Sequence, residues 1–175
     1  MEYLAVTLLG AEQPTLINEL SKLANSCNCN IIESRFTMLG ADFVANLLLV
    51  GTWNAVAKFE ASLASFENKH EIRCLSRRTH LREAHVDNLP YTAYIIAPNK
   101  AGTLYKITQF FNEQSLHIYD MNITTYAAPA TETPMYSITL TFTISAKRLI
   151  ADIRETFMIF CDEYNFDAVM EPQKS

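Results

Sequence analysis

Apolar positions recur along the chain with two spacings, and the spacing changes several times between neighbouring segments. Short, nearly continuous apolar runs have the length of buried strands, whereas apolar residues at three- and four-residue steps form the stripe of an amphipathic helix. Pro14 stands at the expected start of the first helix, where its fixed φ and missing N–H cost little. In the first half the pattern predicts strands at 3–9, 31–39, 43–50 and 71–76 and helices at about 14–26 and 56–66.

The second half repeats this order from Tyr91 onward. Its clearest strand, at 136–144, alternates apolar residues with Ser and Thr, which predicts one apolar and one hydroxyl-bearing face. An Ala-, Pro- and Thr-rich connection at 126–134 is longer than its counterpart in the first half and is typical of a hairpin loop. The phenylalanines expected in the core of this half are Phe110, Phe111, Phe157 and Phe160.

The two halves align at an offset of 87 residues, so that Thr15 falls on Gly102 and Ile31 falls on Ile118. Each half has the order βαββαβ, the split pattern of a ferredoxin-like fold. We therefore predict an α+β protein of two ferredoxin-like domains in tandem, each with an antiparallel sheet packed by two helices. The predicted domains are 1–78 and 90–175, joined by a connector at 79–89. Small ligands often bind where such repeats meet.

Composition supports two ordinary cores, because 49% of the residues are hydrophobic and 19% are charged. The net charge of -5 disfavours direct binding of nucleic acid, since a phosphate backbone is repelled. No basic-then-apolar signal starts the chain, and no apolar run approaches the roughly 18 residues that cross a membrane. We expect a cytoplasmic protein whose four cysteines are reduced thiols.

Catalytic and metal-binding motifs are absent from the sequence. It contains no Gly-x-Ser-x-Gly, phosphate loop, dinucleotide fingerprint or His-Glu-x-x-His. Cys27 and Cys29 have Cys-x-Cys spacing, but no second Cys or His pair stands nearby to complete a zinc site. We expect no catalytic residue, no metal and no cofactor, although a triad formed only in three dimensions stays open.

One basic cluster surrounds the end of the first half and the connector. The default interpretation is a solvated charged edge that discourages strand pairing. A docking patch for an acidic partner surface and a contact with nucleic acid are the two alternatives. The cluster comprises Arg73, Arg77, Arg78, Arg82, His80 and His85.

The first turn of the second half reads Asn-Lys-Ala-Gly-Thr-Leu, from Asn99 to Leu104, and Asn30-Ile31 opens the second strand of the first half. A βαββαβ unit with these features resembles the ACT domain, a family of amino-acid-sensing modules, over residues 3–77 and 91–171. Within that family, the first half is similar to the repressors of the glycine cleavage system, and the second half matches them only at the level of the fold. The motifs that carry this closer likeness are Ser26-Cys27-Asn28-Cys29-Asn30-Ile31, Ser34-Arg35, Met38-Leu39-Gly40, Phe43 and Gly51-Thr52-Trp53-Asn54-Ala55.

The resemblance implies a regulator that does not bind DNA itself. Such a protein would contact a DNA-bound transcriptional activator of the glycine cleavage genes and hold it inactive until glycine, or a similar small amino acid, intervenes. The alternative is a ligand-independent protein-interaction module on the same fold. Further association into a homo-oligomer also stays open.

The turn after each first strand leads into a helix N-terminus, where free N–H groups and the helix dipole favour an anion such as an α-carboxylate. The family pattern places one Asn in this turn and one at the start of the second strand of the other domain. Asn99 and Asn30 match these two places, whereas Glu12 and His117 depart from them. The predicted ligand site comprises Asn99, Lys100, Ala101, Gly102, Thr103, Leu104, Asn30 and Ile31.

A weaker pseudo-equivalent site is predicted around Glu12, Gln13, Pro14, Thr15, His117 and Ile118. Glu12 would repel a carboxylate and can instead pair with His117. Thr15 brings a Cβ to the place where Gly102 has none. The alternative for the first site is that Asn99, Gly102 and Asn30 only form turns.

Overall fold

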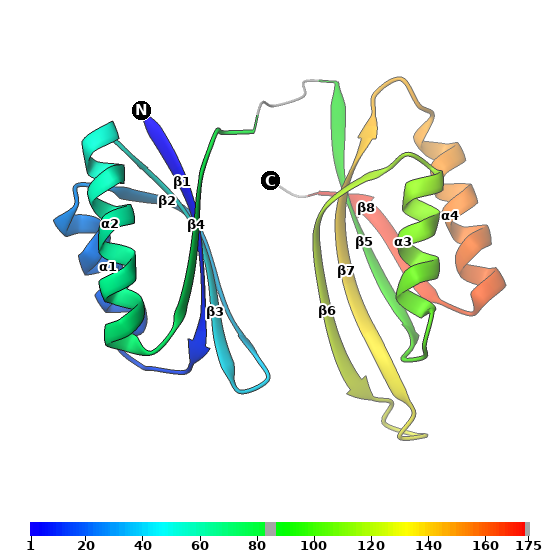
Figure 1. Ribbon diagram of the computed structural model, residues 1–175. Helices are drawn as coiled ribbons and strands as arrows, with labels where there is room; N and C mark the ends of the chain where they lie inside the picture. Colours follow the sequence, from blue (N-terminus) through cyan, green and yellow to red (C-terminus); the bar gives the residue numbers. More distant parts are fainter. Residues whose placement is uncertain (83–86, 174–175) are drawn as a thin grey trace. The chain divides into compact units, whose positions relative to one another are not determined.

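The computed structural model describes residues 1–82 and 87–173, and the chain divides into two compact units, Met1–Glu83 and Ala84–Ser175. Each unit has the order βαββαβ, so the predicted tandem α+β fold is confirmed (Figure 1). His85 of the predicted basic cluster lies outside the described residues, and the predicted limits of the connector stay a prediction.

The N-terminal unit has one four-stranded antiparallel sheet with the strand order β2-β3-β1-β4. Both of its helices lie on the same face of this sheet (Figure 1). The elements are β1 (Glu2–Ala11), α1 (Leu16–Ser26), β2 (Asn30–Leu39), β3 (Asp42–Gly51), α2 (Trp53–His70) and β4 (Arg73–Thr79).

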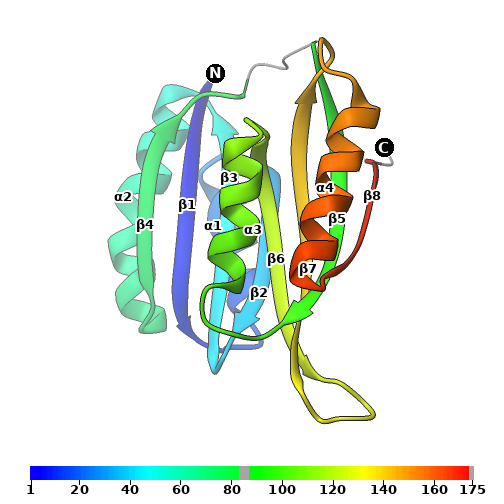
Figure 2. The same ribbon diagram turned by 90° about the vertical axis from the view of Figure 1, so that its right-hand side faces the viewer.

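The C-terminal unit repeats this arrangement with the strand order β6-β7-β5-β8. Figure 2 shows α3 and α4 in front of this second sheet. The elements are β5 (Asn88–Pro98), α3 (Thr103–Glu113), β6 (His117–Ala127), β7 (Pro134–Ser145), α4 (Ile150–Tyr164) and β8 (Asp167–Pro172).

Each unit has its own hydrophobic core between sheet and helices. In the first unit Leu4, Val6 and Leu8, alternate residues in the middle of β1, are buried, and α2 contributes Phe59. In the second unit Phe111 packs against Phe142 and Phe157, with ring centroids 4.8 and 6.0 Å apart. Phe110, Phe111 and Phe157 are buried as predicted, and the partly buried Phe160 packs against them. In β7 the alternation of apolar and hydroxyl-bearing residues therefore identified the side of the strand that faces the helices.

Several predicted boundaries were wrong by a few residues. Helix α1 begins at Leu16 instead of Pro14, because the Leu16 N–H donates to the Gln13 carbonyl across a turn that contains Pro14. Ile17, an apolar residue in the first turn of this helix, is 45% exposed and lies outside the core. Strand β4 begins at Arg73, because Glu71 takes a left-handed conformation (φ 52°) at the end of α2.

The hairpin between β6 and β7 is tighter than the predicted loop at 126–134. Tyr126 pairs with Met135 and Ala127 pairs with Pro134, so both ends of the expected loop are strand. The turn itself is closed by hydrogen bonds from Ala128 N–H to the Thr133 carbonyl and from Glu132 N–H to the Ala128 carbonyl. Composition indicated a loop here but not how far the ladder continues.

The repeat extends to irregular features of the backbone. A β-bulge follows Ile31 in β2, and the same bulge follows Ile118 in β6. The residues before these strands, Asn28 and Ser115, both have a positive φ, of 57° and 53°. Because a bulge shifts the register of a strand, the offset found in the sequence aligns the two backbones residue by residue up to the second strand.

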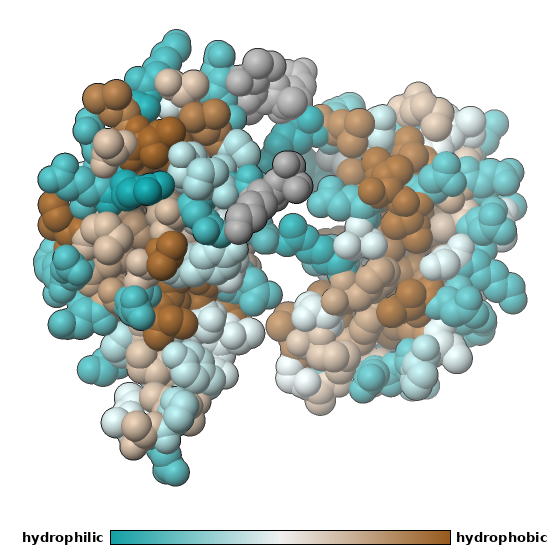
Figure 3. Space-filling view, turned by 180° about the vertical axis from the view of Figure 1, so that it is seen from behind, coloured by the Kyte–Doolittle hydropathy of each residue, from teal (hydrophilic) through white to brown (hydrophobic). Residues whose placement is uncertain are grey.

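Exposed apolar side chains interrupt the hydrophilic surface of both units (Figure 3). Among residues 1–82 and 87–173, no helix has the length and apolar character that a membrane crossing requires.

Candidate functional site

The turn between β5 and α3 has a left-handed glycine at its end. Gly102 has φ 86° and ψ -13° and is the N-cap residue of α3. No atom lies within 4 Å of the place where its Cβ would stand. The backbone conformation therefore favours glycine here, and the space beside it is open.

Three hydrogen bonds fix the shape of this turn. The Asn99 N–H donates to the Pro134 carbonyl at 2.9 Å, which ties the turn to β7. The Lys100 N–H donates to the Pro98 carbonyl at 2.9 Å, and the buried Thr103 hydroxyl donates to the same oxygen at 3.0 Å. The Thr103 hydroxyl is therefore a part of the turn, and its hydrogen is not available to a ligand carboxylate.

Four backbone N–H groups at the start of α3 remain without a partner. Those of Ala101, Gly102, Leu104 and Tyr105 make no hydrogen bond within the part of the chain that the structure describes. Unpaired N–H groups at a helix N-terminus, together with the helix dipole, attract anions. The turn can thus bind a carboxylate through its backbone alone.

Asn30 and Ile31 begin β2 in the other unit. Asn30 is exposed and pairs with Val50, whereas Ile31 is partly buried and packs against the core of its unit. The bulge after Ile31 ends the regular ladder beside them. That Asn30 and the Asn99 turn face one ligand stays a prediction.

The corresponding turn in the N-terminal unit has a different backbone conformation and a proline in place of one donor. Thr15, the N-cap residue of α1, has φ -93° and ψ -8°, so its backbone is right-handed where Gly102 is left-handed. Pro14 occupies the place of Ala101 and has no N–H to donate. Among the described residues of this turn, the N–H groups of Glu12, Gln13, Thr15, Ile17 and Asn18 make no hydrogen bond.

Gln13 of this turn is joined to the last residue of α2. Its Nε2 donates to the His70 carbonyl at 2.6 Å, and its Oε1 lies 3.2 Å from the His70 Nδ1. The His70 ring packs against Phe66 in a tilted arrangement, with centroids 4.4 Å apart, and His70 is only 8% exposed. The sequence analysis missed this contact, because 57 residues separate the two partners and no local pattern signals it.

Glu12, the residue directly after β1, is exposed, and so is His117 at the start of β6. They belong to different units, and their predicted pairing stays a prediction. Ile118, beside the second bulge, is partly buried and packs against the core of the C-terminal unit.

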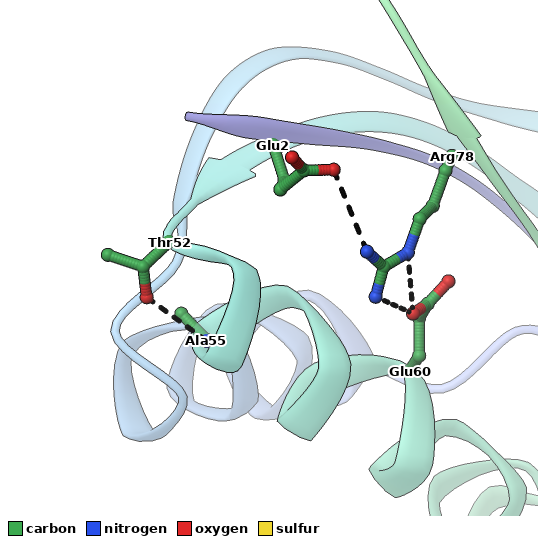
Figure 4. A network of polar contacts seen from close by, with 5 residues as sticks. All are labelled: Glu2, Thr52, Ala55, Glu60 and Arg78. Atoms are coloured by element: carbon green, nitrogen blue, oxygen red, sulfur yellow. Dashed lines mark hydrogen bonds and ion pairs between the residues drawn. The ribbon is translucent and has the colours of Figure 1, made fainter.

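Two arginines of the basic cluster are bound by acidic residues of their own unit. Arg78 donates twice to the Glu60 carboxylate, at 2.8 and 3.1 Å, and lies 3.6 Å from Glu2 (Figure 4). Arg73 donates to Glu67 at 3.0 Å. These contacts favour the charged-edge interpretation, because β4 is an edge strand and part of its positive charge is neutralised.

All four cysteines are free, and burial makes two of them weak acids. Desolvation raises the pKa of the Cys161 thiol to about 12 and that of Cys74 to about 11. Both stay protonated at neutral pH and are therefore poor metal ligands and poor nucleophiles. Within the described ranges, no three His, Cys, Asp or Glu side chains are grouped as metal ligands would be.

Comparison with known proteins gives a family match in the N-terminal unit. Residues 2–74 match the model of the ACT domain. The glycine cleavage system transcriptional repressor of Escherichia coli is 27% identical over 163 residues, which are 93% of this chain and 86% of that protein. The repressor of the same name from Shigella flexneri matches with the same figures.

Two crystal structures share the fold of the whole chain. One is provisionally named as a glycine cleavage system transcriptional repressor; it has a TM-score of 0.74 and 21% identity and covers 99% of this chain and 98% of its own. The other, an unknown protein from Galdieria sulphuraria, has a TM-score of 0.76, 16% identity and 99% coverage of both chains. The chain is therefore a tandem of two βαββαβ units, of which the first matches the ACT domain, and it resembles the glycine cleavage system transcriptional repressor.

Proposed function

We propose that this protein senses glycine, or a similar small amino acid, and controls a transcriptional activator of the glycine cleavage genes by direct contact. The likeness to a repressor of that system over 93% of the chain supports a regulatory role. The net charge of -5 argues that the regulator acts through protein and not by binding DNA itself.

The observation that carries the proposal is the set of unpaired N–H groups at the start of α3. Those of Ala101, Gly102 and Leu104 lie within the predicted site and can donate to an α-carboxylate without any cationic side chain. The amide side chain of Asn99 remains for the ammonium end of the ligand, since only its backbone N–H is used by the turn. Asn30 and Ile31 are proposed to complete the site.

The N-terminal turn is proposed to bind weakly or not at all. Pro14 removes one donor, and the side chain of Gln13 is already bound to His70. Glu12 adds a negative charge that repels a carboxylate. The turn therefore has the role of holding α1 against α2.

The expected affinity follows from the size of the ligand. Glycine has five non-hydrogen atoms, and at a ceiling of about 1.5 kcal/mol per atom its Kd cannot fall far below the micromolar range. To release the activator, glycine binding and activator binding must share a coupling free energy of roughly 1 to 3 kcal/mol.

A thermal-shift screen over the amino acids, followed by calorimetry, tests the proposal. One or a few small amino acids should raise the Tm, and glycine should bind with one strong site per chain. Stabilisation by no amino acid would instead support the ligand-independent interaction module, the second candidate. Two equal sites would contradict the proposed difference between the turns.

A further inference from the structure

The two units differ in the seam between their helices. In the N-terminal unit, α1 and α2 leave a groove of about 580 Å³. The corresponding groove between α3 and α4 is about 200 Å³. Since the two units share one backbone plan, the side chains must account for the difference.

Small residues keep the first groove open. Its floor is formed by Leu23 and Phe66, and its α2 wall by Ala61, Ser62 and Ser65. The Ser62 hydroxyl donates to the carbonyl of Lys58 in its own helix, at 2.8 Å. The Ser62 hydroxyl is therefore satisfied locally, and Ser65 has the remaining hydroxyl on the α2 wall.

Lysines bridge the two helices at the ends of the groove. At one end Lys69 Nζ lies 2.9 Å from the Glu19 carboxylate, and this contact lowers the pKa of Glu19. At the other end Lys58 Nζ donates to the Ser26 carbonyl at 3.0 Å. Glu19 and Ser26 are seven residues apart, which is about 10 Å along a helix. The open length thus corresponds to about two helical turns.

The C-terminal unit shows how the same seam is closed. Phe110 stands at the place of Leu23. Phe160 corresponds to Phe66 when α2 and α4 are aligned on the left-handed residues that follow them, Glu71 and Asn165. The rings of Phe110 and Phe160 stack with centroids 4.6 Å apart. Beside them Lys106 Nζ lies 4.1 Å from the centre of the Tyr164 ring. Aromatic side chains therefore fill the second groove.

The rims of the two grooves carry opposite charges at equivalent places. Glu163 stands where the first groove has Lys69, and Lys106 stands where it has Glu19. Lys22, which also lines the first groove, forms no ion pair with any described residue. The first groove therefore combines an apolar floor with a net positive rim in a protein whose total charge is negative.

We propose that the α1–α2 groove is a docking site for an acidic amphipathic segment of a partner protein, with one large apolar side chain placed over Leu23 and Phe66. Carboxylates of the segment would pair with Lys22 and Lys69. A groove between two helices that is two turns long suits a helix laid along it. A small polar metabolite would need several convergent polar groups, and the α2 wall of this groove offers only the Ser65 hydroxyl. The inference rests on the proposed function in one respect, that the protein acts through protein contact.

Two synthetic peptides of 14 residues test the groove directly. One is a helical peptide of Glu, Ala and Leu with a central Trp, and the other has Lys in place of Glu. In NMR titrations with the full chain, the acidic peptide should shift the amide signals of Leu23, Ser62 and Ser65. Higher salt should weaken the binding of this peptide. Equal binding of the Lys peptide, shifts confined to the other unit, or no binding of the acidic peptide would overturn the proposal.

A matched pair of substitutions in α2 completes this test. Ser65→Trp fills the groove, whereas Ala64→Trp adds the same side chain next to it at an exposed position that does not line the groove. Ser65→Trp should weaken binding of the acidic peptide at least tenfold, whereas Ala64→Trp should leave the Kd of the peptide within twofold of the wild-type value. Lys22→Glu should weaken it severalfold. If Ser65→Trp binds as wild type does, the groove is not the site.

Titration with the purified activator of the glycine cleavage genes separates this inference from the proposed function. If wild type binds the activator and Ser65→Trp binds it equally well, the groove proposal fails and the proposed function stands. If wild type does not bind the activator, the proposed function fails. The peptide titrations then still show whether the groove binds an acidic helical segment.

Discussion

Gly102 shows how much a single residue determines at the candidate site. Its φ of 86° places the first N–H groups of α3 at the surface of the turn, and the open space beside it leaves them accessible. The repeat pointed to this position from the sequence, because Gly102 falls opposite Thr15. The φ angles of the two residues have opposite signs, and this difference could be seen only in the structure.

Replacing Gly102 by Ala should lower the free energy of unfolding by about 1 kcal/mol, because the left-handed conformation is unfavourable for Ala while its Cβ meets no other atom. Gly102→Asn, which tolerates this conformation better, should cost less. Urea denaturation of both variants measures the difference. Equal stability of wild type and Gly102→Ala would mean that the turn changes shape without cost.

At the same scale, Asn99→Ala should weaken glycine binding at least fivefold in calorimetry. The Tm without ligand should stay near that of wild type, because the turn uses the backbone N–H of Asn99 and not its amide. Glu12→Ala serves as the control and should leave the strong site unchanged. Unaltered binding by Asn99→Ala would remove this turn from the site.

Among the elements, α2 begins and ends with contacts that can each be tested. Thr52, its N-cap residue, accepts a hydrogen bond from the Ala55 N–H at 3.2 Å (Figure 4). At the far end, Glu67 accepts from the Cys74 N–H at 2.9 Å and from Arg73, which joins the helix to β4. Periodicity predicted that this helix exists, but not where the following strand begins, since the left-handed Glu71 follows no apolar pattern.

Thr52→Ala should destabilise the N-terminal unit by about 1 kcal/mol, because one helix N–H loses its side-chain acceptor. Thr52→Ser keeps the hydroxyl and should recover most of the loss. The midpoint of urea unfolding, followed by the fluorescence of Trp53 in the same unit, measures both variants. A loss of the same size in Thr52→Ser would assign the effect to the methyl group of Thr52.

Glu67 should contribute stability only while it is ionised. The Cys74 N–H and then Arg73 lower its pKa in the folded protein, so its contribution is present above the unfolded value of about 4.3 and disappears as the pH falls through the folded value. Wild type should therefore be more stable than Glu67→Gln at pH 7, and the two should converge once the pH has fallen below the lowered folded pKa of Glu67. A difference that is independent of pH would show that the charge has no part in it.

For the molecule as a whole, the sequence analysis predicted the fold because duplication doubles every signal. An uncertain strand in one half is supported by its partner in the other, as the shared bulges after Ile31 and Ile118 show. What it could not predict are contacts between distant residues that occur in one copy only. The Gln13–His70 contact is one example. The open α1–α2 groove could not be predicted for the same reason, because it too depends on side chains that differ between the copies.

The Gln13–His70 contact also limits how the N-terminal turn can change. Replacing Gln13 to free the turn would leave the carbonyl and Nδ1 of His70 without their partners, and each such buried group costs about 1 to 3 kcal/mol. The His70 Nε2 already has no hydrogen-bond partner among the described atoms. A Gln13 substitution that opened the N-terminal turn to a ligand would thus destabilise the protein before it added any affinity for that ligand. Mutation is therefore expected to preserve the difference between the two turns.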